Sequence, residues 1–419
     1  MITTINNKHK KLNFSSEREQ SQACLNSAEH EKNQGRKVLN VPNLRFPEFK
    51  GEWEKYKVSD LLDFYSTNSL SWDKLEYGTD AIQNLHYGLI HVGSSTMIDL
   101  SKDKLPNITN GNTPKNYELC QEGDIAFADA SEDTNEVAKA VEFYKLKGKD
   151  VICGLHTIHG RDNQQKTVVG YKGYAFSSTA FHHQIRRIAQ GTKIYSINSK
   201  NFSECYIGIP SKEEQKKIAT LLRQIDERIV TQNKIIDKLQ SLIKGIAQKI
   251  VHSNKTNVRL SECVECSSST LQESDVCEHG AYPVYGANGI VGYLDNYNTD
   301  GEAVYIIKDG SGVGTVSYVT GKCSATGTLN TLQAKEGYSL QYLYYLLKVF
   351  NFEPYKTGMA IPHIYFKDYG KAKFFCPSYT EQLQYAQSLS AIDSKLLVEK
   401  NILTSLSMQK KYLLRQMFI

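Results

Sequence analysis

P-S-K-E-E-Q at residues 210–215 and P-S-Y-T-E-Q at residues 377–382 are the two stretches that decide the fold of this chain. Each opens a long helical pattern, which runs to about Val251 in the first copy and to the C-terminus in the second. The second pattern repeats the first at a constant offset of 167 residues, without a gap. Serine followed three residues later by glutamate is a capping box, in which side chains bond backbone donors that lack partners in the first turn. The two long helices are therefore copies of one element with defined starts.

Apolar residues follow each start at alternating spacings of four and three, which is typical of a coiled-coil seam. Gln232 and Glu399 hold the same position in the two copies, and one polar layer can set the register of a seam at a cost in stability. A helix of about 41 residues spans roughly 60 Å, longer than a face of a small domain. We therefore expect the seams to bury each other; the alternative is that each helix packs on its own domain. The seam residues are Ile218, Leu222, Ile225, Ile229, Ile236, Leu239, Ile243, Leu389, Ile392, Leu396, Leu403, Leu406 and Leu413.

Globular segments alternate with the two helices along the chain. The first helix leaves the first domain and arrives at the second, while the second helix leaves the second domain. Paired seams must therefore run antiparallel, and we predict an α+β fold in which a helix pair with pseudo-two-fold symmetry holds two globular domains apart. We expect a loosely ordered arm at 1–40, globular domains at 41–209 and 254–376, and long helices at 210–253 and 377–419.

Local patterns inside the globular segments support a tandem duplication of the whole chain. The same offset aligns two sets of residues, Ile194, Ile197, Lys200 and Phe202 with Ile361, Ile364, Lys367 and Tyr369. Strands are expected at Asp124–Asp129, Thr167–Phe176, Ala303–Lys308 and Val313–Val319. A short helix is expected at Leu340–Phe350, capped by Ser339.

Length and composition set broad limits. At 419 residues the chain has room for two or three domains. Nine cysteines and a polar N-terminus without a secretory signal favour a reducing, cytoplasmic location. No apolar run approaches the length that spans a bilayer, so we expect no membrane partner. The formal net charge is only +5, so any nucleic-acid surface must concentrate its basic groups on one face.

Motifs for catalysis and metal binding are incomplete. G-S-G-V-G at 310–314 precedes a strand-like run and lacks the third glycine of a dinucleotide site, so we interpret it as a turn. There is no P-loop and no N-P-P-Y or D-P-P-Y motif, so we expect no bound cofactor and no methyl transfer by this chain. Cys263-x-x-Cys266 with Cys277 and His279 suggests zinc, but a second C-x-x-C pair is missing. We predict no catalytic residue and no metal.

Recognition is the function class that remains. Loops rich in Tyr, Asn, Lys, Arg and His can supply both phosphate contacts and base-edge hydrogen bonds. The candidate DNA contacts in the first domain are Lys166, Tyr171, Lys172, Tyr174, His182, His183, Arg186 and Arg187. Those in the second domain are Tyr285, Asn288, Lys308, Ser311, Lys322, Lys356 and His363.

With this duplication, the chain resembles the specificity subunit of type I restriction–modification systems. The most specific marks are the helix openings I-P-S-K-E-E-Q-K-K-I-A at 209–219 and C-P-S-Y-T-E-Q at 376–382, each of which closes a globular domain. Y-P-V-Y-G-A-N-G-I-V-G-Y at 282–293 and P-H-I-Y-F-K-D-Y at 362–369 look like parts of that family's target-recognition domains. L-R-F-P-E-F-K-G-E-W at 44–53 resembles a frequent entry sequence, while the polar arm before it departs from the family.

The resemblance implies a non-catalytic, DNA-binding chain. Each target-recognition domain would read one half of a bipartite, asymmetric site in double-stranded DNA, and the helices would set the gap. Two modification subunits would bring S-adenosylmethionine and methylate adenine at N6, and restriction subunits would use ATP and Mg to cut foreign DNA. Two rival classes stay open: a coiled-coil protein-interaction scaffold without DNA binding, and an enzyme with an unrecognised site.

Overall fold

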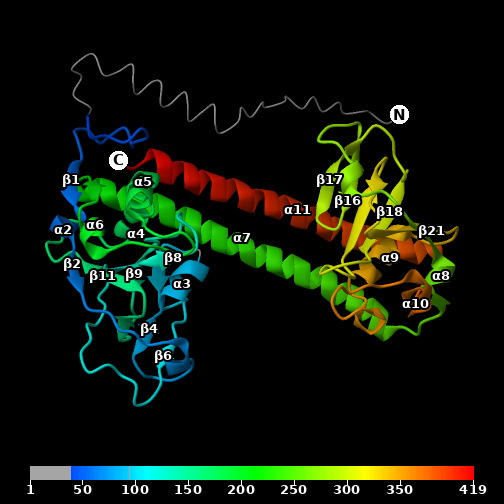
Figure 1. Ribbon diagram of the computed structural model, residues 1–419, viewed down its shortest axis with the longest axis horizontal. Helices are drawn as coiled ribbons and strands as arrows, with labels where there is room; N and C mark the ends of the chain where they lie inside the picture. Colours follow the sequence, from blue (N-terminus) through cyan, green and yellow to red (C-terminus); the bar gives the residue numbers. More distant parts are fainter. Residues whose placement is uncertain (1–38, 94) are drawn as a thin grey trace. The chain divides into compact units, whose positions relative to one another are not determined.

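This computed structural model describes residues 39–93 and 95–419. The predicted N-terminal arm lies outside the described residues except for its last two positions. The chain divides into two compact units (Figure 1). Unit 1 runs up to residue 222 and also takes 412–419, whereas unit 2 comprises 223–411.

Both long helices are present and each contributes to both units. They are α7 (Lys212–Ser253) and α11 (Tyr379–Gln416). No helix among the described residues combines the length and apolarity needed to cross a membrane.

Among the described residues, unit 1 is built on a five-stranded sheet with the order β2-β11-β7-β9-β5. Its strands are β2 (Asp63–Tyr65), β5 (Met97–Asp99), β7 (Ile125–Ala128), β9 (Ala140–Lys145) and β11 (Thr157–Arg161). Neighbours are antiparallel except for β5 and β9, which are parallel. The central strand β7 sends Phe127 to one face and Ala126 and Ala128 to the other, because strand side chains alternate. Phe127 packs there with Phe176 and Phe202, so β7 is buried on both faces.

A smaller sheet and short helices complete unit 1. The smaller sheet has the order β10-β4-β6-β3, from β3 (Leu75–Glu76), β4 (Gln83–Leu85), β6 (Asn107–Ile108) and β10 (Val151–Cys153). The remaining strands are β1 (Glu54–Lys57), β8 (Ala130–Ser131), β12 (Tyr195–Ser196) and β13 (Tyr206–Ile209). The helices are α2 (Val58–Leu61), α3 (Tyr87–Val92), α4 (Lys172–Phe176), α5 (Thr179–Ile188) and α6 (Ser199–Ser203), with a 3-10 turn at Trp72–Lys74.

Unit 2 holds an antiparallel sheet with the order β15-β21-β18-β19 and a second sheet with the order β17-β16-β20. The strands are β14 (Val258–Arg259), β15 (Val264–Ser268), β16 (Tyr282–Gly286), β17 (Gly289–Leu294), β18 (Glu302–Ile307), β19 (Val316–Thr320), β20 (Ser324–Ala325), β21 (Leu329–Ala334) and β22 (Lys373–Phe374). The helices are α8 (Leu260–Cys263), α9 (Leu340–Leu347) and α10 (Phe366–Tyr369), with 3-10 turns at Glu273–Asp275 and Glu353–Tyr355. Ser339 caps α9 by accepting from the N–H of Tyr342 at 3.3 Å, as predicted.

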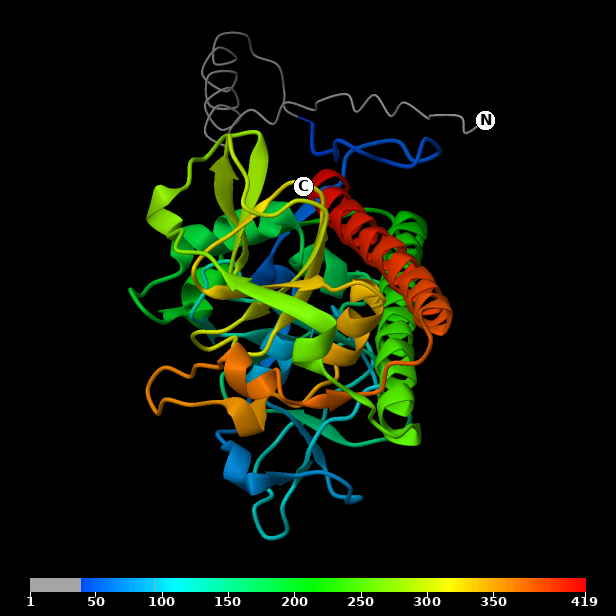
Figure 2. The same ribbon diagram turned by 90° about the vertical axis from the view of Figure 1, so that its right-hand side faces the viewer.

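The long helices pair antiparallel within unit 2, as the topology predicted. Both views show α7 and α11 side by side there (Figures 1 and 2). Asp226 forms an ion pair with Lys410, while Gln232 donates from Nε2 to the main-chain carbonyl of Glu399 at 3.0 Å and also to its carboxylate. Residue numbers thus rise along α7, from 226 to 232, while those of their partners on α11 fall from 410 to 399, which is the antiparallel order. The predicted seam residues are buried or half-buried along both helices.

The polar layer marks the pseudo-two-fold axis. Gln232 and Glu399 are equivalent residues, 167 positions apart. In an antiparallel pair of equivalent helices, only one layer can bring equivalent residues face to face, and that layer lies on the axis. An amide opposite a carboxylate satisfies this layer, whereas two carboxylates would repel each other.

Strand registers confirm the tandem duplication. Strand β1 pairs with β13 so that Lys57 faces Tyr206, and β14 pairs with β22 so that Arg259 faces Lys373. Tyr206 and Lys373 are separated by the same offset as the helices. Each long helix also has a buried glutamine in its first turn, Gln215 in α7 and Gln382 in α11. Each of these glutamines donates to the carbonyl of the proline that precedes its helix, at 2.9 Å in both copies.

Two local predictions differ from the structure. The segment Thr167–Phe176 is a turn followed by α4, because Gly170 has a φ of 91° and the chain then coils around the buried carboxylate of Glu142. The capping box is complete only at α11. At α7, Ser211 accepts from the N–H of Glu214, but the Glu214 carboxylate binds Arg45 instead.

Candidate nucleic-acid interface

A short hairpin loop projects from unit 1 at residues 190–196, termed hairpin loop 1. Gln190 and Ser196 close it with two reciprocal N–H···O bonds of 2.9 Å. Gly191 has a φ of 139°, and a Cβ there would lie 1.9 Å from the carbonyl oxygen of Ile194. Only glycine fits this tight turn. The turn leaves Ile194 59% exposed at its tip.

Unit 2 carries the same loop at residues 357–363, termed hairpin loop 2. Thr357 and His363 close it with bonds of 2.9 and 2.7 Å. A Cβ on Gly358 would lie 2.4 Å from the carbonyl oxygen of Ile361, and Ile361 is 58% exposed. Every one of these positions is related to hairpin loop 1 by the offset of the long helices. An exposed isoleucine presented by a turn that only glycine fits is therefore a shared surface feature of both units.

Each hairpin loop sits beside an aspartate–histidine pair at the end of a central strand. In unit 1, Asp129 follows β7, and its Oδ1 lies 3.1 Å from Nδ1 of His156. In unit 2, Asp309 follows β18, and its Oδ1 lies 2.6 Å from Nδ1 of His363. The carboxylate accepts from Nδ1–H, which leaves Nε2 of each imidazole to bind another group. The histidines come from different loops, so the same pairing is built twice by different segments.

Basic residues of α5 lead directly into hairpin loop 1. His183, Arg186 and Arg187 are exposed, and Arg186 donates to Asn135 Oδ1 at 2.9 Å and lies 3.0 Å from Nδ1 of His183. Partial desolvation and the neighbouring Arg186 and Arg187 lower the pKa of His183, which favours its neutral form. The three residues form one polar face, where exposed guanidinium groups suit phosphate or guanine contacts.

Three predicted contacts of unit 1 belong to the interior, and a fourth, His182, is half-buried. Tyr171 and Tyr174 are fully buried, and Tyr171 donates to the carbonyl of Gly208 at 3.0 Å. Lys172 is only 3% exposed and lies 3.4 Å from Glu142, with a hydrogen bond of 2.8 Å to Thr167. Burial lowers the pKa of His182 to about 4, so it stays neutral. Because Tyr171, Lys172 and Tyr174 point into the core, these three leave the set of candidate DNA contacts.

Lys166 lies elsewhere in unit 1. Its Nζ sits 3.9 Å from the ring centroid of Tyr56, which is a cation–π contact. This contact holds Lys166 over Tyr56 of β1.

The candidates of unit 2 fall into separate groups. His363 closes hairpin loop 2 and Lys356 directly precedes it. The segment from Lys308 to Ser311 lies beside the loop, since the N–H of Ile364 bonds the Lys308 carbonyl at 2.9 Å and the N–H of Gly310 bonds the Pro362 carbonyl at 3.0 Å. Lys356 forms an ion pair of 2.6 Å with Glu353. Half-buried Tyr285 and exposed Asn288 belong to the β16–β17 hairpin. Lys322 lies apart, 4.7 Å from the ring of Tyr297.

The sequence-based list missed the apolar tips of the two loops. Lys193, Ile194, Met359 and Ile361 are all exposed. The sequence does contain a sign of these tips, namely the glycine and the isoleucine that recur at the offset of 167 residues. An exposed apolar residue in two equivalent turns is not explained by core packing and indicates a binding surface.

A cavity of about 690 Å³ adjoins hairpin loop 1 within unit 1. Tyr87, His91 and His156 line it together with Ile194. Three carboxylates, those of Glu132, Asp133 and Glu136, face one lysine, Lys139, which forms an ion pair of 2.8 Å with Glu136, so the lining is acidic on balance. Carboxylates there would repel phosphate but can accept a hydrogen bond from an exposed base amino group. The cavity therefore suits a base edge better than the DNA backbone.

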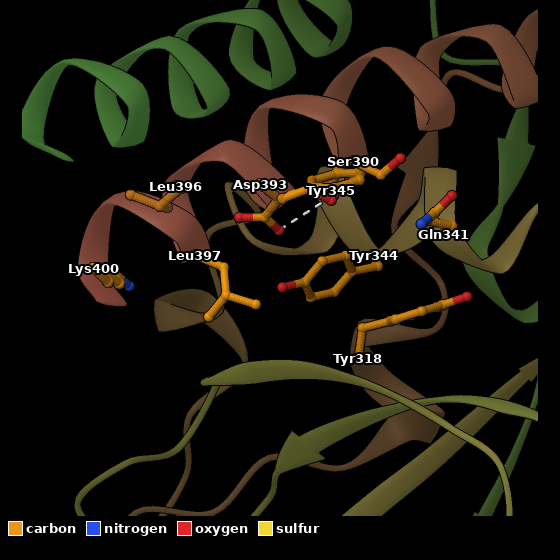
Figure 3. A pocket seen from close by; sticks show the side chains of 10 residues that line it. Tyr318, Gln341, Tyr344, Tyr345, Ser390, Asp393, Leu396, Leu397 and Lys400 are labelled. Carbon is orange, nitrogen blue, oxygen red and sulfur yellow. Dashed lines mark hydrogen bonds between the residues drawn. The ribbon is translucent and has the colours of Figure 1, made fainter. Parts of the chain in front are cut away.

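A second cavity, of about 380 Å³, lies within unit 2 where α9 and β19 meet α11 (Figure 3). The Tyr345 hydroxyl donates to Asp393 at 3.2 Å, beside Leu397, which is 62% exposed. Val230 of α7, the equivalent of Leu397, is 48% exposed. The helix pair thus presents an apolar residue to solvent at the same repeat position of both helices.

Comparison with known proteins identifies related chains. A family model for the type I restriction modification DNA specificity domain matches residues 103–241 and again 252–408. The chain is 28% identical over 113 residues to the EcoprrI type I restriction enzyme specificity subunit of Escherichia coli, covering 27% of this chain and 28% of that protein. It is 26% identical over 219 residues to the putative MjaX specificity subunit of Methanocaldococcus jannaschii, covering 51% of this chain and 49% of that protein. The matches span half or less of these relatives.

Solved structures share the fold. The type I restriction–modification S subunit from M. genitalium superposes with a TM-score of 0.59 at 18% identity, over 90% of this chain and 99% of that one. A chain from a structure of complex assembly and conformational transition in the type I R-M system gives a TM-score of 0.53 at 14% identity, over 86% and 96%.

Proposed function

Because this chain belongs to the type I restriction modification DNA specificity family, we propose that it is the DNA-binding specificity subunit of a type I restriction–modification complex. Each globular domain reads one half of a bipartite site in double-stranded DNA, and the helix pair sets the unread gap. The observation that carries the proposal is the hairpin loop, which recurs in both units with the same glycine turn and the same exposed isoleucine.

The two half-sites should differ in sequence. The loops share a backbone but not their side chains: Thr192, Lys193 and Ser196 in loop 1 correspond to Met359, Ala360 and His363 in loop 2. Lysine and serine suit phosphates or base acceptors, whereas methionine suits a thymine methyl group or a wedge between base steps. Equivalent loops with different chemistry give an asymmetric target.

The helix pair docks two copies of one partner. An antiparallel pair with a pseudo-two-fold axis presents two equivalent surfaces, and Val230 and Leu397 stand exposed at the same position of each. A single asymmetric chain can therefore bind two identical modification subunits. Those subunits supply S-adenosylmethionine and adenine methylation, and restriction subunits supply ATP- and Mg-dependent cleavage. This chain, which works in the cytoplasm, has no catalytic role.

Methylated-base sequencing of the host genome, with and without the gene, tests this proposal. We expect one split adenine motif to lose methylation on deletion. Replacing residues 256–376 by the corresponding domain of another family member should then change one half-site and keep the gap. A change in both half-sites would contradict the division of labour between the domains. Purified full chain that binds no DNA carrying the motif, even with its methyltransferase, would favour the scaffold alternative.

A further inference from the structure

Two thiols and an imidazole converge in the interior of unit 1. The ligand atoms of Cys120, Cys153 and His159 all lie within 4.8 Å of one another, and all three residues are buried. They come from three separate segments: the approach to β7, the end of β10 and the middle of β11. Cys153 belongs to the smaller sheet and His159 to the larger one, so the cluster joins the two sheets.

The imidazole of His159 is arranged as a ligand. Its Nε2 lies 2.8 Å from Oδ2 of Asp124, whereas its buried Nδ1 has no hydrogen-bond partner among the described residues. Arg161 holds the Asp124 carboxylate with two bonds, at 2.9 and 2.8 Å. An ionised carboxylate fixes the proton on Nε2, so Nδ1 keeps a free lone pair. A buried acceptor without a partner is costly unless something binds it, and carboxylate–histidine–metal chains have this layout.

The sulfur spacing also fits a shared cation. Cys120 Sγ and Cys153 Sγ are 3.6 Å apart. Two thiolates on a tetrahedral zinc ion, with bonds of about 2.3 Å, lie about 3.8 Å apart. A disulfide fits less well. The N–H of Cys120 bonds the carbonyl of Val151, so Cys120 lies opposite Val151, and Cys153, two residues further along β10, is its diagonal neighbour. Diagonal neighbours are about 7–8 Å apart at Cα, beyond the usual disulfide range.

We propose that Cys120, Cys153 and His159 bind one structural zinc ion, with water or another small donor as the fourth ligand. Thiolate and imidazole are the donors that zinc prefers in proteins. On binding, each thiol loses its proton, while His159 loses none. The ion would brace the connection between β10 and β11, which carries His156 and its bond to Asp129 beside hairpin loop 1. It would therefore hold rigid a part of the candidate interface.

Sequence patterns did not indicate this site, since its ligands are spread from residue 120 to residue 159 without C-x-x-C spacing. A second pair of thiols offers an internal control. Cys263 Sγ and Cys376 Sγ in unit 2 lie 3.9 Å apart, but the described residues bring no histidine to them. Close thiols alone should not retain zinc.

The test measures zinc in the full chain, purified under reducing conditions and dialysed against a weak chelator. We expect about one zinc ion per wild-type chain, background levels in C120S and C153S, and wild-type levels in C376S. Cobalt titration of zinc-stripped wild-type chain should give thiolate-to-cobalt absorption bands, and C376S should give the same bands. The cobalt measurement keeps the test decisive even where a ligand variant fails to fold.

Three results would overturn the proposal. One is wild-type chain without zinc and without cobalt–thiolate bands. Another is equal zinc in C120S, C153S and wild type, which would place the metal elsewhere. The third is an intact mass, measured without reductant, that shows Cys120 and Cys153 joined as a disulfide in the chain as purified.

Discussion

Lys172 offers the sharpest test of the assignments in unit 1, because the sequence suggests a DNA contact and the structure a core ion pair. Its Nζ lies 3.4 Å from Glu142 Oε1, and both side chains are buried. The K172M variant keeps the length of the side chain but removes its charge. Removing one partner of a buried pair costs about 3–5 kcal/mol. Glu142 retains N–H bonds from Gly170 and Gly173, both at 2.8 Å, so we expect the lower end, about 3 kcal/mol.

The assay compares urea unfolding with the salt dependence of DNA binding. The matched control is K193M, on the exposed hairpin loop 1 of the same unit. K193M should change the free energy of unfolding by less than about 0.5 kcal/mol. If Lys193 contacts a phosphate, its loss lowers the slope of log affinity against log salt by about 1. K172M should lose stability with the slope unchanged.

A reversed pattern would refute this reasoning. If K172M unfolds like wild type and weakens the salt slope, then Lys172 reaches DNA and the buried pair is not a feature of the working protein. The double variant E142Q/K172M gives a second check, because removing both charges should recover part of the loss. Purely additive effects of the two substitutions would mean that the residues do not interact.

Three further predictions concern pH, helix capping and docking. Half-buried His182 has a pKa of about 4, below its unfolded value of about 6.5, so the unfolded state takes up a proton first as pH falls. The free energy of unfolding should drop by about 2 kcal/mol between pH 7 and 4.5 through this group. H182Q should flatten that part of the stability curve, and the exposed control H279Q should not. S378A removes the cap that starts α11 and should lower the free energy of unfolding in urea by about 1 kcal/mol. A change smaller than about 0.3 kcal/mol in either direction would show that the cap is dispensable. V230S and L397S should each weaken co-purification of the methyltransferase, and the double variant should abolish it, whereas unchanged recovery would move the docking surface elsewhere.

The long helices were predictable because their signals are local and repeated. A capping serine, a four–three apolar spacing and one polar layer recur at a fixed offset, and helix periodicity needs no distant partner to be recognised. Antiparallel pairing followed from chain order alone. The bond between Gln232 and Glu399 then showed where the symmetry axis lies.

The candidate interface was predicted less well. Residue type alone does not tell a surface lysine from a buried one, so the sequence points to Lys172 and not to Lys193. Burial of Lys172 depends on Glu142, which lies 30 positions earlier on β9 and enters no local pattern. In the sequence, the two exposed isoleucines indicate only the duplication and not a surface site, since an apolar residue is ordinarily assigned to a core.

The sequence by itself determined the tandem duplication, the two long helices and their antiparallel sense, because those properties depend on periodicity and chain order. Tertiary structure alone decided which polar groups face solvent and which meet inside. Cys120, Cys153 and His159 come together only because a smaller sheet packs beside a larger one. Likewise, only the tertiary structure shows why glycine is needed in the hairpin loops, because a carbonyl oxygen in each loop lies too close to the glycine to leave room for a side chain. Contacts between distant segments are set by packing, and no local pattern encodes them.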